Sequence, residues 1–174
     1  MSLKHAILGL LDLRPMTGYD LKKTFDNSAR HFWAADRSQI YRTLGMLHGD
    51  GLVTEKVIAQ QSRPDRHEYR LTKAGAAELD SWLRSPVPVE LPREAFLARI
   101  FFAGRADDRE LVRTLVAERR TLAQERLDEL QAVEAPKTTY ADRLRAMTLR
   151  NGIMHLEVEL SWLAELDREL VAAL

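Results

Sequence analysis

The sequence predicts a mainly α-helical protein with one small β hairpin, divided into two parts by a short linker. Apolar residues recur at helical spacing through most of the chain. Two β-branched and aromatic segments, "LVTEKVIAQ" and "HEYRLT", flank the turn-forming stretch "QSRPDR". The stretch "SPVPVELP" then ends one helical segment before another begins. We therefore expect domains at residues 1–85 and 92–174, with a linker at residues 86–91.

The chain opens with two short predicted helices. Ser2 is suited to cap the first, which ends before Pro15 because the residue before a proline avoids the helical conformation. Its inward positions recur at helical spacing and are Leu3, Ile7, Leu10 and Leu11. Thr17 and Asp20 form a capping pattern at the start of the second helix, "TGYDLKKTF".

The third predicted helix lies in "DRSQIYRTLGMLHGDGLV", residues 36–53. Asp36 is expected to cap it, with Gln39 three residues later completing a capping box. At about 100° per residue, one side carries Ile40, Leu44 and Leu47. The opposite side is polar and partly bare, and carries Ser38, Arg42, Gly45 and Gly49. Such a face suits the close approach of another molecule.

Further helices follow the hairpin. Thr72 is expected to cap a fourth helix, "KAGAAELDSWL", in which Trp82 is interpreted as a core residue. Beyond the linker, the spacing predicts helices over residues 93–104, 107–133 and 138–172. The order of three helices, a basic hairpin and a helix is that of a winged helix-turn-helix domain, here followed by an α-helical extension. In that architecture the third helix enters the major groove of DNA.

The composition agrees with a globular protein that attracts DNA through one part of its chain. Of 174 residues, 45% are hydrophobic, and the formal net charge is zero. Residues 1–75 carry twelve Lys and Arg against eight Asp and Glu, a net +4, whereas residues 76–174 carry fourteen against eighteen, a net −4. The phosphate groups of nucleic acids are attracted to such a local excess of positive charge. With no cysteine, no apolar run of about 18 residues and no signal-peptide pattern, we expect a cytoplasmic protein.

The segments "GYDLKKTF", "FWAADRSQIYRTLGMLHGDGLV" and "SRPDRHEYRLTKAGAAELDSWL" strongly resemble the PadR family of winged-helix transcription regulators, and the C-terminal helices resemble its longer-tailed branch. The positions that carry the match are Gly18, Tyr19, Ile40, Tyr41, Leu44, Leu47, Gly51, Leu52, Val53, Tyr69, Leu71, Thr72 and Gly75. The resemblance implies a dimeric DNA-binding repressor or activator whose C-terminal helices form the dimer, often with a small-molecule effector. Relatives often have proline where this chain has Arg42, so we expect a different base to be read.

The candidate DNA contacts lie on the second helix, the third helix and the hairpin: Tyr19, Lys22, Lys23, Ser38, Gln39, Tyr41, Arg42, Arg63, Arg66 and His67. Arginine can bond guanine through two atoms, glutamine can do the same with adenine, and serine reaches phosphate or base. We expect Arg42 to read a base, and Arg66 to hold a phosphate from the hairpin tip. The alternative for each is a side chain that is only solvated at the surface.

Two apolar features point to an effector and a dimer. Phe32 and Trp33 precede the third helix and, with Trp162, could wall a pocket for a small aromatic or apolar effector; the alternative is core packing. The last helix carries a heptad seam formed by Leu149, Ile153, Leu156, Leu160, Leu163 and Leu170. Asp167 interrupts one line of this seam, which would pack either within the chain or between two subunits.

Catalytic and metal-binding motifs are absent from the sequence. The five histidines have no metal spacing, and Asp107 with Asp108 fits a helix cap better than a catalytic pair. We expect a homodimeric repressor of operator DNA that a small molecule relieves, with no metal, no cofactor, no membrane partner and no enzyme activity. The rival interpretation is a winged-helix module that docks a partner protein through its helical tail; DNA binding would weaken with rising salt, and an apolar protein complex would not. A weaker rival is an enzyme with an unrecognised pocket.

Overall fold

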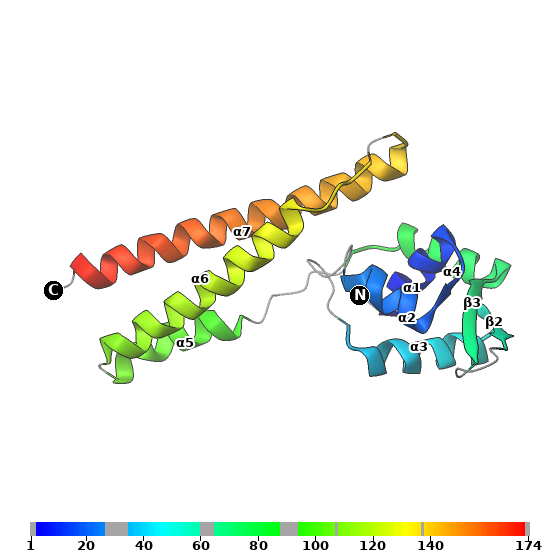
Figure 1. Ribbon diagram of the computed structural model, residues 1–174, viewed down its shortest axis with the longest axis horizontal. Coiled ribbons are helices and arrows are strands. Elements are labelled where there is room, and N and C mark those ends of the chain that lie inside the picture. The colour runs from blue at the N-terminus through cyan, green and yellow to red at the C-terminus, as the bar shows by residue number, and fades with distance from the viewer. Residues whose placement is uncertain are drawn as a thin grey trace. The chain divides into compact units, whose positions relative to one another are not determined.

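The computed structural model describes residues 3–26, 35–59, 65–87, 94–106, 108–136 and 138–172. The chain divides into two compact units, Met1–Val89 and Glu90–Leu174. The elements of the first unit are α1 (Leu3–Leu13), β1 (Met16–Thr17), α2 (Gly18–Thr24), α3 (Arg37–Gly49), β2 (Val53–Ile58), β3 (Arg66–Leu71) and α4 (Lys73–Arg84) (Figure 1). This is the predicted order of helices and hairpin, with one additional strand.

Three helices of this unit begin at the residues that the sequence predicts as caps. Thr17 Oγ1 accepts a hydrogen bond from the Asp20 backbone N–H at 3.1 Å, and the Asp20 carboxylate accepts one from the Thr17 N–H at 3.2 Å. Asp36 and Gln39 form the same reciprocal pair at α3, and Thr72 caps α4. The caps satisfy backbone N–H groups that have no partner inside the helix, so they mark where each helix begins.

Strand β1 was not predicted, and it connects the hairpin to the start of α2. Strands β2 and β3 form the expected antiparallel hairpin, and the sheet order is β1-β3-β2. Met16 lies opposite Tyr69, and Thr17 lies opposite Glu68. A two-residue strand has no alternation to detect, because only its pairing with β3 makes it a strand. The pairing places the residue that caps α2 directly beside β3.

The core of this unit lies where α1, α2, α3 and the sheet meet. Its buried residues are Ile7, Leu8, Leu11, Met16, Leu21, Phe25, Ile40, Leu44, Leu47, Val53 and Tyr69. The prediction that Trp82 belongs to the core is wrong. Its half-buried ring stacks on His5 of α1, with ring centroids 4.9 Å apart, and does not belong to the buried cluster. Trp82 therefore covers the edge of the α1–α4 contact.

The elements of the second unit are α5 (Ala95–Ala103), η2 (Gly104–Ala106), α6 (Arg109–Gln131) and α7 (Tyr140–Ala172). Helices α6 and α7 lie side by side as a helical hairpin (Figure 1). Leu163 of α7 is completely buried, and Val116 of α6 is almost completely buried. Two ion pairs join the helices, Arg119 with Glu159 at 2.5 Å and Arg120 with Asp167 at 3.1 Å.

The leucine seam therefore packs at least partly within the chain. Leu163 is buried without a second copy, and Asp167, which interrupts the repeat, forms an ion pair with α6. The other seam residues whose side chains the structure describes are half-buried: Leu149, Ile153, Leu156 and Leu160. The side chain of Leu170 is not among those that the structure describes.

None of the helices in the described ranges is both long enough and apolar enough to cross a bilayer.

A different stripe of α7 is exposed. It comprises Tyr140, Leu144, Met147, Met154 and Val158, whose exposed fractions run from 50% to 77%. Their spacing places them on one face of the helix. The α6–α7 hairpin leaves this exposed stripe uncovered.

Candidate nucleic-acid interface

Helix α3 presents a polar face to solvent, as predicted. Its apolar stripe is buried, while Ser38, Arg42, Gly45 and Gly49 are exposed. Within the part of the chain that the structure describes, the Arg42 guanidinium has no ion pair or ring contact. A Cβ atom added to Gly45 or Gly49 would meet nothing within 4 Å. The packing of the protein itself therefore does not require glycine at these positions, and the face has room for another molecule.

Gln39 is less available for contact with DNA bases than its exposure suggests. Its side-chain oxygen accepts a hydrogen bond from the Asp36 backbone N–H at 3.1 Å, which is half of the capping box. Reading adenine would use both the oxygen and the NH₂ group of glutamine. Base reading by Gln39 would therefore compete with the cap of α3, whereas Ser38 and Arg42 have no such competing role in the described structure.

Tyr41 fixes α3 against the start of α2. A Cβ atom on Gly18 would lie 2.6 Å from Cε1 of Tyr41, so the ring packs directly on the Gly18 backbone. The Arg37 guanidinium carbon lies 5.6 Å from the centroid of the same ring, within the range of a cation–π contact. Tyr41 is still 40% exposed, so it combines packing with access to a ligand.

The polar side of α2 carries three of the predicted contacts. Tyr19 is 64% exposed, and Lys23 is exposed with no ion pair among the described residues. Lys22 forms an ion pair with Asp26 one turn later, which partly offsets its charge. Tyr19 and Lys23 are therefore the more accessible of the three.

Glu55 holds two side chains of β3 from the neighbouring strand. Its carboxylate lies 2.7 Å from His67 Nδ1 and accepts a hydrogen bond from the Tyr69 hydroxyl at 2.9 Å. The bond from Tyr69 has the largest effect and lowers the pKa of Glu55; burial opposes it, and the contact with His67 lowers the pKa further. Burial and the bond to Glu55 raise the pKa of Tyr69 to about 12. His67 is thus paired within the hairpin instead of being a free cation.

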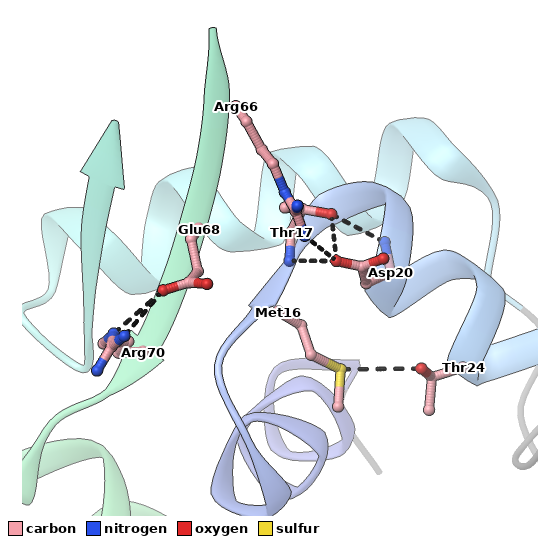
Figure 2. Close-up of polar contacts among 7 residues, drawn as sticks. All are labelled: Met16, Thr17, Asp20, Thr24, Arg66, Glu68 and Arg70. Atoms are coloured by element: carbon pink, nitrogen blue, oxygen red, sulfur yellow. Dashed lines mark hydrogen bonds and ion pairs between the residues drawn. The ribbon is translucent and has the colours of Figure 1, made fainter. Parts of the chain in front are cut away.

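Arg66 is also paired. Its Nη2 atom donates a hydrogen bond to Asp20 Oδ2 at 3.1 Å, which connects the start of β3 to the first turn of α2 (Figure 2). Burial alone would raise the pKa of Asp20, but the hydrogen bonds from Thr17 and the charge of Arg66 outweigh it, and the pKa is lowered. Asp20 therefore stays ionised near neutral pH.

An open cavity of about 730 Å³ lies where these elements meet. Helices α2 and α3 and the hairpin all line it, through Tyr19, Asp20, Tyr41, Glu55, Arg66 and Tyr69 among others. The elements that a winged helix applies to DNA thus converge on one surface of this unit.

Several predictions fall outside the described residues or on other contacts. Ser2, Phe32, Trp33 and Arg63 lie outside the described ranges. Trp162 is half-buried in the second unit and meets the edge of Phe96, with ring centroids 6.2 Å apart. In the described part of the chain, no three His, Asp or Glu side chains gather in a way that could hold a metal.

Sequence reasoning missed the two carboxylates that hold the hairpin. Asp20 was interpreted only as a helix cap, and Glu55 only as part of a strand. The alternation of β2 could have placed Glu55 on the same face of the hairpin as His67 and Tyr69, but only with the strand register known. Nothing in the local sequence pairs Asp20 with Arg66.

Comparison with known proteins places this arrangement in a family. Residues 7–81 match the transcriptional regulator PadR-like family, and residues 92–170 match the family described as virulence activator alpha C-term. A Mycobacterium tuberculosis protein named "Probable transcriptional regulator Rv1176c" is 31% identical over 188 residues, which cover 98% of each chain. The chain belongs to the PadR-like family of transcriptional regulators. The PadR-like resemblance and the winged-helix fold with a helical tail are thereby confirmed.

Solved structures of similar proteins match nearly the whole chain. Bacillus subtilis PadR in complex with operator DNA has a TM-score of 0.79 and 26% identity, covering 97% of this chain and 98% of that one. The same protein in complex with p-coumaric acid has a TM-score of 0.71 and 26% identity, covering 97% and 94%. The Vibrio cholerae virulence activator AphA has a TM-score of 0.77 and 29% identity, covering 99% and 100%. Bacillus subtilis PadR is named a negative transcriptional regulator, and is 36% identical over 102 residues, which are 58% of this chain and 56% of PadR.

Proposed function

We propose that this PadR-like regulator binds operator DNA as a homodimer and represses transcription until a small molecule releases it. The exposed face of α3 carries the proposal, because Arg42 lies opposite a buried stripe and can enter a groove without disturbing the core. The complex of the Bacillus subtilis relative with operator DNA supports binding, and the description of that relative as a negative regulator supports repression.

We assign different tasks to the predicted contacts. Arg42 and Ser38 would read bases, while Tyr19, Lys23 and Tyr41 would contact the DNA backbone from exposed positions on α2 and α3. The remaining candidates in the described structure have internal partners and would contribute mainly through the position of what they hold: Lys22, Gln39, Arg66 and His67. Arg63, outside the described ranges, stays a prediction for a phosphate contact.

The homodimer would be formed by the C-terminal unit. The exposed apolar stripe of α7 supports this, because a face of that kind is commonly covered by another protein surface. We therefore assign the second copy to the stripe around Met154 and Val158. Leu163 is already buried by α6 and contributes to the stability of each subunit.

The effector would be a small aromatic or apolar molecule. The p-coumaric acid complex of Bacillus subtilis PadR supports that chemistry. Phe32, Trp33 and Trp162 remain the candidate lining, because aromatic faces suit planar ligands. An effector releases DNA only by binding better to a form of the dimer in which the two recognition helices no longer match the operator.

Selection of bound duplexes from a random DNA pool tests the proposed function. We expect a palindromic motif whose half-sites are about one helical turn, roughly 34 Å, apart. Affinity should fall steeply as salt rises, because phosphate contacts release counterions. A pool without enrichment, together with a salt-tolerant complex with another protein, would favour the interaction-module alternative.

A further inference from the structure

The ion pair between Asp20 and Arg66 joins two elements that flank α3. Asp20 lies in the first turn of α2, Arg66 is the first residue of β3, and 46 positions separate them. We propose that Asp20 is a positioning residue for DNA binding. It holds Arg66 and fixes the position of the hairpin relative to α2. The two side chains therefore contribute jointly, and not independently, to the affinity for DNA. This inference rests on the proposed DNA-binding function.

The Asp20 carboxylate is held in place before Arg66 reaches it. Its Oδ2 atom accepts hydrogen bonds from the Thr17 backbone N–H at 3.2 Å and the Thr17 hydroxyl at 2.8 Å. Thr17 itself belongs to β1, which pairs with β3 opposite Glu68. The acceptor is thus fixed relative to β3, so forming the ion pair costs conformational freedom mainly in the Arg66 side chain (Figure 2).

The pair also has a defined electrostatic consequence at the DNA surface. A carboxylate near phosphates would repel them, but its own arginine neutralises it. The Asp20 side chain is 27% exposed and that of Arg66 is 51% exposed, so both are accessible from solvent. If Arg66 stays with Asp20, the pair neutralises no phosphate and releases no counterion. If Arg66 left Asp20 for a phosphate, the salt dependence of binding would include it.

A double-mutant cycle in the full-length protein separates these roles. Asp20→Asn keeps an oxygen that can accept from Thr17, and Arg66→Gln removes the guanidinium from an exposed position. We expect each single variant to lower affinity for the selected operator about tenfold, and the double variant to be no weaker than either. Independent contributions would instead multiply to about a hundredfold. The double variant removes both charges of the pair, so its slope of log K against log salt should remain that of the wild type.

The Arg70–Glu68 pair offers a matched control. It lies within β3, with Arg70 Nη2 3.0 Å from Glu68 Oε1, and its side chains do not reach α2 (Figure 2). Glu68→Gln, Arg70→Gln and the double variant should therefore leave operator affinity close to that of the wild type, because this pair does not join the hairpin to α2.

Three results would overturn the inference. They are stronger operator binding by Asp20→Asn, independent effects in the Asp20–Arg66 cycle, and a salt slope in the double variant that falls by about 0.9, the value for one phosphate contact. If Asp20→Asn unfolds, the same cycle with Asp20→Glu in its place still distinguishes coupled from independent effects. Wild-type protein that binds none of the DNA pool would overturn the proposed function instead, and is distinguishable because no variant is involved.

Discussion

Replacement of Arg42 by alanine tests whether α3 reads DNA sequence. Arg42 is exposed and has no ion pair in the described structure, and arginine and alanine are both good helix formers. The free energy of unfolding should therefore change by no more than about 0.5 kcal/mol. A change in DNA binding would then report on the contact and not on folding.

The expected loss follows from the position of the side chain. Arg42 lies on the side of α3 opposite Ile40, Leu44 and Leu47, all of which are at most 1% exposed. That side is the one that can face a groove while the stripe stays buried. A two-atom contact with a guanine discriminates by about 1–3 kcal/mol, which corresponds to roughly fivefold to 150-fold in affinity. The loss should be confined to one base pair in each half-site.

The assay is competition binding against a panel of single base-pair changes in the selected operator. We expect Arg42→Ala to lose preference at one position and to keep it elsewhere. Lys23→Ala, which removes an exposed cation from α2, should weaken binding to every member of the panel and lower the salt slope by about 0.9. A uniform loss by Arg42→Ala across the panel would refute the assignment, and would make Arg42 a phosphate contact.

Three further changes test other parts of the structure. Gly45→Ala should stabilise the free protein by up to about 1 kcal/mol in chemical denaturation, since a Cβ there meets nothing within 4 Å; unchanged operator affinity would show that DNA leaves that space empty. Leu163→Glu should destabilise the protein by at least about 3 kcal/mol, because Leu163 is 0% exposed, whereas Val158→Glu should leave stability intact and yield a monomer in sedimentation. A wild-type monomer would remove the dimer proposal. Tyr69 holds its proton to a pKa of about 12, above the ordinary 10.0, so its contribution to stability is present below pH 10 and is lost as pH rises toward 12. Tyrosinate absorbance should show this late titration, and Tyr69→Phe should abolish it.

Features that depend on neighbours in the sequence were predictable from it. The caps at Thr17, Asp36 and Thr72 each pair with a residue three positions later, because a side chain reaches only the backbone of the next turn. The buried stripe of α3 follows from helical periodicity alone, and so does the exposure of Arg42 on the opposite side. The family motif adds the winged-helix order, which places α3 and the hairpin together.

Contacts between distant residues were decided only by the tertiary structure. Asp20 and Arg66 are both ordinary surface residues in the sequence, and meet only because β1 brings the start of α2 beside β3. Glu55 reaches His67 and Tyr69 only in the observed register of β2 and β3. The heptad in α7 indicates a helix that packs, and the ion pair of Asp167 with Arg120 shows that α6 is one partner. Periodicity specifies which face of an element is apolar, but the free energy of the whole chain selects the surface that covers it.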